Sequence, residues 1–308
     1  MKSSFYDIND KNGDYQEISA SIRRILNGLK AMAMIYHDYS DDIDSFDRIH
    51  ELKDNLGYRL KSAEHHYLLL LNEYLAKENE ISAVLKNDPK LFQVNFVGRN
   101  QVTQKVEEEL AAIFDSLIYH LNSTFDYLAH ITSYICMKEI KNTVSWMKLK
   151  KFAFAKGNEL SILWIKKTII KVNNDFVASL YDYRSRLIHT KRDVHPIIAY
   201  KSNGAEVTQL YLSASDVAKK FFKKSLAKFD SDRGISLSFL ASTLIRDTLT
   251  NIELMLDALV YEINVASNFP NNWDESKKGL MLIHRDPKTN KGKLVSDMEW
   301  DKFKEKTE

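Results

Sequence analysis

Apolar residues recur every three or four positions along most of the chain, which is the spacing of one face of an α-helix. In the first stretch they fall at Ile18, Ile22, Ile25 and Leu29, within a predicted helix over residues 15–39. The same spacing predicts further helices over residues 47–86, 103–141, 158–188, 215–229 and 236–265. The expected fold is therefore all-α, a helical bundle of about six long helices.

Two short regions depart from this spacing. Residues 197–212 alternate around Ser202-Asn203-Gly204, which predicts a small β-hairpin insertion with an Asn-Gly turn. The C-terminal tail over residues 268–308 is polar, and a weak strand pair is predicted around 281–284 and 293–295. The predicted division is an N-terminal helical hairpin over 1–100, which could pack on the core, a helical bundle over 101–267, and the tail.

Composition excludes several protein classes. The 308 residues include 9 Gly and 4 Pro, too few for the tight turns of sandwiches, barrels and Gly-loop nucleotide folds. The single cysteine cannot form an internal disulfide or a thiolate metal cage. The N-terminus lacks an apolar signal core, and no uncharged apolar run is long enough to span a membrane. We therefore expect a cytoplasmic protein that does not associate with a membrane.

The formal net charge of +2 conceals an uneven distribution of charge along the chain. Residues 138–171 contain nine lysines and two glutamates. Aromatic residues alternate with these lysines, at Trp146, Phe152, Phe154 and Trp164. Lysines that neutralise phosphates, beside rings that stack on bases, are typical of single-strand nucleic-acid binding. The alternative is a solvated helix face whose aromatic residues belong to the core.

The sequence lacks the motifs of many enzyme classes. It has no Gly-rich dinucleotide motif, no P-loop, no G-x-S-x-G elbow and no H-E-x-x-H zinc motif. A di-iron site in a bundle needs Glu-x-x-His pairs, and the sequence contains none. We therefore expect no bound metal and no cofactor.

One segment combines groups that can cleave a phosphodiester without a metal. It is Tyr183-Arg184-Ser185-Arg186-Leu187-Ile188-His189, at the end of a predicted helix. An arginine can neutralise the nonbridging oxygens, and a histidine can move protons at neutral pH. RNA supplies its own nucleophile, the 2′-hydroxyl. On a continuous helix the side chains of Arg184 and His189 point about 140° apart, so they meet only if the arginine reaches round or the helix end bends.

This segment resembles the mark of the HEPN superfamily, an arginine followed after four to six residues by a histidine, late in a helical bundle. Arg184 and His189 match the Arg-x4-His form, with Arg186 as a charged third position. The resemblance implies a metal-independent endoribonuclease with Arg184 and His189 as its catalytic pair. It also implies a homodimer in which two such pairs face one another.

The resemblance further implies RNA as the substrate, a toxin or antiviral-defence role, and an antitoxin or defence-system protein as a partner. Two positions depart from the family pattern. Ser185 stands where members commonly carry Asn, Asp or His, and Lys191 stands where antitoxin-paired members often carry Tyr. Regulation by modification of that tyrosine is therefore not expected.

Other residues are candidates for supporting roles. Ser185 and Arg186 belong to the motif, and a polar stripe on the helix predicted over 103–141 includes Asn122, Asp126 and His130. That stripe faces either water or an interior site, where these residues could orient the catalytic pair. The expected RNA-binding residues are Lys150, Lys151, Lys166, Lys167, Lys191 and Arg192.

Alternative interpretations stay open. Arg59 also precedes His65 and His66 at permitted spacings, and we interpret that set as a surface face. Other histidines, including His120 and His195, are expected to be structural or exposed. The motif itself could be a helix terminus at which cations complement the dipole. The chain could then be a catalytically inactive module that binds nucleic acid or a partner protein, or a scaffold with no nucleic-acid role.

Overall fold

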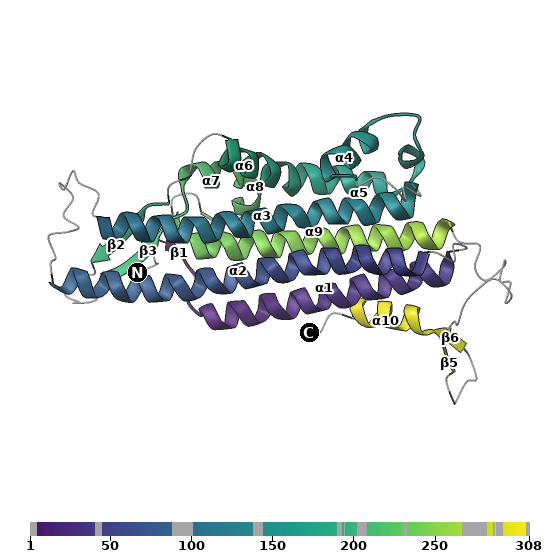
Figure 1. Ribbon diagram of the computed structural model, residues 1–308, viewed down its shortest axis with the longest axis horizontal. Helices are drawn as coiled ribbons and strands as arrows, with labels where there is room; N and C mark the ends of the chain where they lie inside the picture. Colours follow the sequence, from purple (N-terminus) through teal and green to yellow (C-terminus); the bar gives the residue numbers. More distant parts are fainter. Residues whose placement is uncertain are drawn as a thin grey trace. The chain divides into compact units, whose positions relative to one another are not determined.

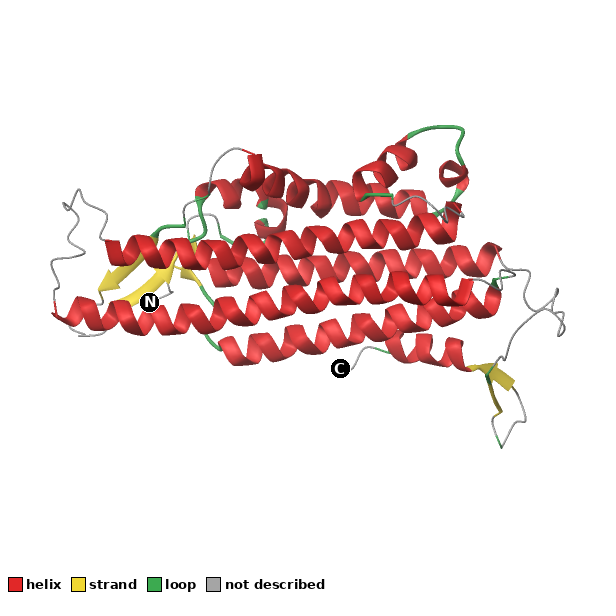
Figure 2. Cartoon of the chain, in the orientation of Figure 1, coloured by secondary structure: helices red, strands yellow, loops and turns green. Residues whose placement is uncertain are grey.

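The computed structural model describes a chain that is mostly helical (Figures 1 and 2). The described residues are 5–40, 45–87, 101–137, 144–189, 193, 195–201, 208–230, 233–266, 282–285, 287 and 292–305. Within them, strands form three two-stranded sheets. The predicted all-α helical bundle is confirmed.

Four long helices carry most of the buried apolar residues. They are α1 (Lys11–Tyr39), α2 (Ser45–Asn87), α3 (Gln101–Met137) and α9 (Leu237–Ala266). Their ends lie close to the predicted ones because each depends on a repeating apolar face. In α1, for example, Ile18, Ile22, Ile25 and Leu29 are all buried.

The helix predicted over 158–188 is wrong as a single element. The region contains η2 (Glu159–Ile162), α5 (Ile165–Val172), the π-helical turn η3 (Asn173–Val177) and α6 (Ala178–His189). A further helix that was not predicted, α4 (Trp146–Phe154), precedes it. The start of α5 has a tertiary cause, because Glu262 accepts a 2.7 Å hydrogen bond from the backbone N–H of Ile165. Apolar periodicity does not reveal such a cap.

The shorter elements agree with the prediction in part. The hairpin pairs β2 (Ile197–Lys201) with β3 (Thr208–Leu212), and its Asn203-Gly204 turn lies outside the described residues. The tail pairs β5 (Ile283–Arg285) with β6 (Gly292–Leu294) as predicted, and then forms the unpredicted helix α10 (Val295–Lys304). In place of one helix over 215–229 there are α7 (Asp216–Phe221) and α8 (Lys223–Leu226). The parallel pair β1 (Phe5–Tyr6) and β4 (Gly234–Ile235) was not predicted.

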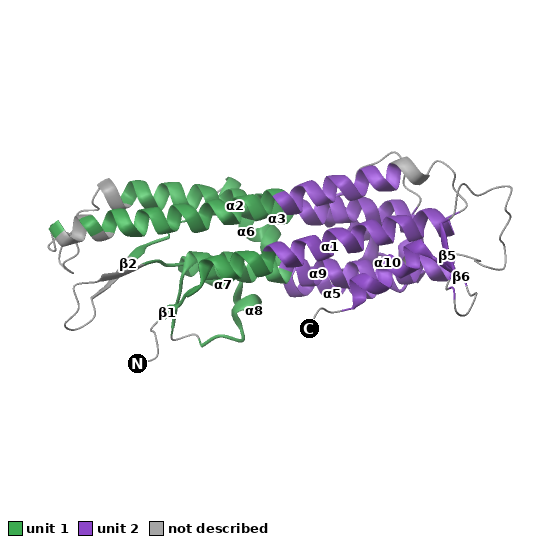
Figure 3. Ribbon diagram, turned by 90° about the horizontal axis from the view of Figure 1, so that it is seen from below, with its two compact units in different colours: residues 1–18, 62–122, 178–247 green, residues 19–61, 123–177, 248–308 purple. Residues whose placement is uncertain are grey.

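The chain divides into two compact units, coloured separately in Figure 3. Unit 1 comprises Met1–Ile18, Ser62–Asn122 and Ala178–Asp247, and unit 2 comprises Ser19–Lys61, Ser123–Val177 and Thr248–Glu308. The helices α1, α2, α3 and α9 contribute to both units. The predicted division into 1–100, 101–267 and 268–308 stays a prediction about which segments fold independently.

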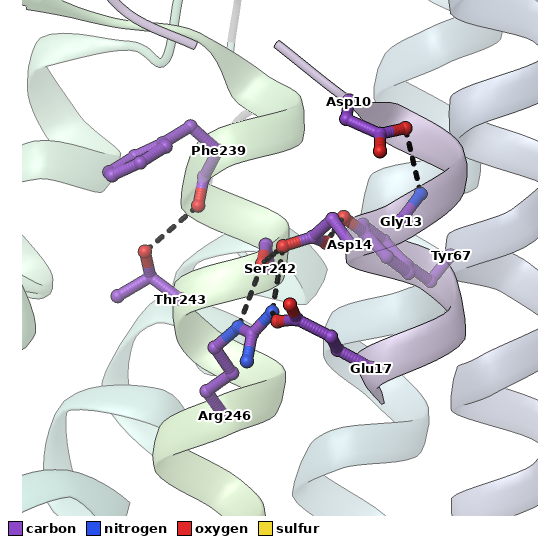
Figure 4. Close-up of polar contacts among 9 residues, drawn as sticks. All are labelled: Asp10, Gly13, Asp14, Glu17, Tyr67, Phe239, Ser242, Thr243 and Arg246. Carbon is purple, nitrogen blue, oxygen red and sulfur yellow. Dashed lines mark hydrogen bonds and ion pairs between the residues drawn. The ribbon is translucent and has the colours of Figure 1, made fainter. Parts of the chain in front are cut away.

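Unit 1 is held together by a polar network as well as by its core (Figure 4). Asp14 of α1 accepts hydrogen bonds from the Tyr67 hydroxyl of α2 and from Ser242 of α9. Arg246, one turn further along α9, donates to Asp14 at 2.9 Å and to Glu17 at 2.8 Å. The network therefore joins three helices through one carboxylate.

Unit 2 has a core around Trp146, whose ring is fully buried and lies 5.4 Å from the ring of Phe125. The tail helix α10 belongs to this unit: Tyr39 donates to Asp297, and the Phe303 ring lies against Gly28. A Cβ atom at residue 28 would come within 2.7 Å of that ring, so the close approach requires glycine.

Among the described residues, no helix has both the length and the apolar character needed to cross a membrane.

Candidate functional site

The Arg-x4-His segment forms the last turns of α6, and the helix continues to His189. Tyr183 is fully buried, Arg184 and Arg186 are half-buried, and Ser185 and His189 are exposed. Because α6 stays helical, the side chains of Arg184 and His189 diverge by about 140°. The helix end therefore does not bring the two side chains together within one chain.

Arg184 packs against an aromatic residue of α3. Its guanidinium carbon lies 5.0 Å from the centre of the Tyr119 ring, a cation–π geometry. Its Nε is buried and has no hydrogen-bond partner among the described residues. A guanidinium stacked in this way keeps its terminal N–H groups as donors for an anion.

The Tyr119 ring continues into a row of imidazoles. It contacts His120 with a centroid distance of 5.4 Å, and His120 contacts His66 of α2 at 4.8 Å. His65 lies edge-on to His66 at 5.9 Å. We call these residues, His65, His66, Tyr119, His120 and Arg184, the histidine–arginine face.

This face is not predictable from the sequence, because its rings come from helices far apart in the chain. The sequence predicts a surface face for His65 and His66 and a structural or exposed position for His120. The Nδ1 of His66 donates to the carbonyl of Ser62 at 2.8 Å, since a carbonyl can only accept.

A buried polar network joins Tyr183 of α6 to Asp193 and to the start of α7. The Tyr183 hydroxyl donates to Asp193 Oδ2 at 2.8 Å, and the Ser215 hydroxyl donates to the same oxygen. Ser215 also caps α7 by accepting from the N–H of Ala218, and its own N–H donates to Nδ1 of the buried His195. Burial, together with the Asp193 charge, raises the pKa of Tyr183, so its hydroxyl stays a neutral donor.

The polar stripe of α3 does not have a single environment. Asn122 is fully buried, and neither of its side-chain polar atoms has a partner among the described residues. Asp126 accepts a 2.9 Å hydrogen bond from the backbone N–H of Trp146 and so supports the start of α4. Burial lowers the pKa of His130, Asp126 opposes that shift, and Arg48 adds to it.

The basic stretch of unit 2 combines core and surface aromatics. Trp146 is a core residue, whereas Trp164 is 55% exposed and has the Lys167 ammonium 4.3 Å from its ring centre. Phe154 is also exposed. The predicted RNA-binding lysines comprise Lys151 and Lys167, which are exposed, and Lys150 and Lys166, which are half-buried. Lys191 and Arg192 lie outside the described residues.

Unit 1 also contains a cavity of about 440 Å³. Five carboxylates line it, those of Asp7, Asp10, Asp14, Glu17 and Asp247. The lining also includes Lys228 and Arg246, so negative charges outnumber positive ones. Such a cavity repels a phosphate backbone. In the part of the chain that the structure describes, no cluster of His, Cys, Asp or Glu could hold a metal ion.

Comparison of the chain with protein-family models, curated proteins and solved structures finds no match.

Proposed function

We propose that this chain is a HEPN-like, metal-independent endoribonuclease. Arg184 neutralises the phosphate to be cut, and His189 moves protons. The substrate's 2′-hydroxyl attacks phosphorus, the bond to the 5′-oxygen breaks, and that oxygen takes a proton as it leaves. The products are a 2′,3′-cyclic phosphate and a 5′-hydroxyl. The expected setting is a toxin or antiviral-defence system, with an antitoxin or defence protein as a further partner.

The observation that carries the proposal is the chemistry of the α6 end. A guanidinium held on the Tyr119 ring and an exposed imidazole lie on one helix. Tyr183, the residue before Arg184, is held by a buried hydrogen bond to Asp193. A guanidinium restrained by its ring contact loses less entropy when it binds a transition state.

The divergence of Arg184 and His189 supports the homodimer. One helix directs these side chains to different sides, so a single protomer does not offer both to one linkage. Two antiparallel copies of the α6 end would combine Arg184 of one chain with His189 of the other. The exposed Lys151, Lys167 and Trp164 of unit 2 supply a further surface for the RNA backbone and bases.

The test is cleavage of a fluorescent single-stranded RNA by the full chain in the presence of a chelator. We expect cleavage to continue under chelation and His189→Ala to lower the rate roughly 10²- to 10⁴-fold, the usual effect of removing a proton-transfer group. The matched control is His284→Ala, an exposed histidine of β5, which should cut like the parent. Undiminished cleavage by His189→Ala, or strict dependence on a divalent ion, would contradict the proposal.

A catalytically inactive module that binds nucleic acid or a partner protein is the second candidate. The divergence of Arg184 and His189 favours it if the chain works as a monomer, because the pair then cannot act on one linkage. Such a module retards cellular RNA in a gel without shortening it, whereas the nuclease shortens it.

A further inference from the structure

We infer that the histidine–arginine face binds an unpaired segment of RNA, whose bases stack on Tyr119 and the histidines while Arg184 holds a phosphate. The inference rests on the proposed function and deepens it, because it says where the substrate lies before it is cut. None of the face's ring residues belongs to the Arg-x4-His motif.

The side chains of the face are of the types on which unpaired bases stack. The face consists of neighbouring planar groups, with successive centroid distances of 5.9, 4.8 and 5.4 Å between rings and 5.0 Å from Tyr119 to Arg184. The first and third ring pairs are edge-on and the second is tilted, so the rings present differently oriented surfaces. Single-stranded RNA is recognised by stacking of bases on Tyr and His rings and on guanidinium planes.

Tyr119 differs from the core aromatic residues in the exposure of its side chain. Phe114, earlier on α3, is a core aromatic with 0% exposure, whereas Tyr119 is 42% exposed. His65 is exposed as well, and His66 and His120 are half-buried. Tyr119 and His65 therefore leave ring surface accessible to a ligand.

Two rings of the face are restrained before a ligand binds. The hydrogen bond from His66 to the Ser62 carbonyl fixes one imidazole, and the Arg184 guanidinium restrains the Tyr119 ring. A platform whose rotamers are already restricted loses less entropy on binding. Paired bases cannot reach it, because in a duplex their faces are covered by neighbouring base pairs.

The experiment measures binding without cleavage. The full chain carrying His189→Ala is titrated into a fluorescent single strand of about ten nucleotides, and into the same strand annealed to its complement. We expect the single strand to bind more tightly than the duplex. Tyr119→Leu should weaken single-strand binding roughly 5- to 100-fold, the loss typical of one stacked base.

Matched variants separate stacking from other causes. Tyr119→Phe keeps the ring and should bind nearly like the parent. Tyr58→Leu removes another exposed tyrosine, 63% exposed and 5.4 Å from the Arg59 guanidinium, and should leave binding unchanged. Thermal unfolding of each variant checks that the fold is intact.

The outcomes distinguish this inference from the proposed function. Unweakened binding by a folded Tyr119→Leu variant, equal binding of duplex and single strand, or no RNA binding at all would overturn the inference. If binding depends on Tyr119 but the protein with His189 intact leaves RNA whole, the face stands and the nuclease proposal fails. If the protein cuts RNA and Tyr119→Leu binds normally, only the face is wrong.

Discussion

Tyr183 of α6 and Asp193 are joined by a buried 2.8 Å hydrogen bond. The next residue along α6, Arg184, has its guanidinium carbon 5.0 Å from the centre of the Tyr119 ring. Two consecutive residues therefore have different roles: Tyr183 makes a buried hydrogen bond, and Arg184 supplies the cation of the candidate site.

The Tyr183→Phe variant removes this hydrogen bond and keeps the ring. Asp193 retains the Ser215 hydroxyl as a donor but loses the Tyr183 hydroxyl in a buried site. We expect the free energy of unfolding to fall by about 1–3 kcal/mol, measured by urea denaturation. Tyr261→Phe, at a tyrosine that is 50% exposed, should change it little. Equal free energies of unfolding for Tyr183→Phe and Tyr261→Phe would show that the hydrogen bond from Tyr183 to Asp193 does not stabilise the fold.

The Arg246→Met variant tests the network that joins α1, α2 and α9. The methionine keeps the apolar stem, but Asp14, whose side chain is only 15% exposed, loses its charged donor. We expect a loss of about 1–2 kcal/mol in unfolding free energy.

The matched control is Arg48→Met, which breaks an ion pair with the exposed Glu51 three residues away. Because exposed pairs of this kind contribute about 0.5 kcal/mol or less, Arg48→Met should be close to neutral. A larger loss in Arg48→Met than in Arg246→Met would contradict the importance of Asp14.

Local periodicity predicted the elements that depend on a local pattern. The helices α1, α2, α3 and α9 each repeat an apolar face, and the hairpin β2–β3 follows its alternating residues. Elements set by distant groups were missed. The start of α5 depends on Glu262, 97 positions away. Trp146 and Trp164 share one basic stretch, yet the first is buried against Phe125 and the second is exposed.

The candidate site was predictable only as a motif. Residue type and spacing singled out Arg184 and His189, because an arginine and a histidine have suitable chemistry wherever they lie. The contact of Arg184 with Tyr119 joins α6 to α3, and the contact of His66 with His120 joins α2 to α3. Such contacts depend on helix packing, which no local pattern in the sequence reveals.

His130 makes stability depend on pH. Burial lowers its pKa in the folded protein, so the unfolded chain binds the proton first as the pH falls. The contribution of neutral His130 is full above its unfolded pKa of about 6.5, and it is lost as the pH falls through the lower folded pKa.

We therefore expect the free energy of unfolding to decrease as the pH falls below about 6.5, and His130→Gln to reduce that decrease. His284→Gln, at an exposed histidine, should keep the pH dependence of the parent. If His130→Gln leaves the whole decrease in place, another group causes it.

Asn122 separates stability from function. Its buried amide has no partner among the described residues, so replacing it with the similarly sized leucine removes an unfavourable buried polar group. We expect Asn122→Leu to be neutral or stabilising in urea denaturation. The same change at Asn173, which accepts from the Trp146 ring N–H at 3.3 Å, should destabilise the protein. A loss of RNA cleavage in a stable Asn122→Leu variant would then assign the amide a role at the site.

The composite active site can be tested by mixing two inactive variants. If each site takes Arg184 from one chain and His189 from the other, a dimer of Arg184→Ala and His189→Ala chains contains one site with both groups intact. Mixing the purified variants under conditions that exchange subunits should therefore restore RNA cleavage that neither shows alone. The control is the Arg184→Ala variant alone, carried through the same exchange, because it supplies no Arg184 to any site. Differently labelled chains verify that the two variants have exchanged subunits. If the mixture of the two variants then stays inactive, Arg184 and His189 of separate chains do not share a site, and the dimeric mechanism is wrong.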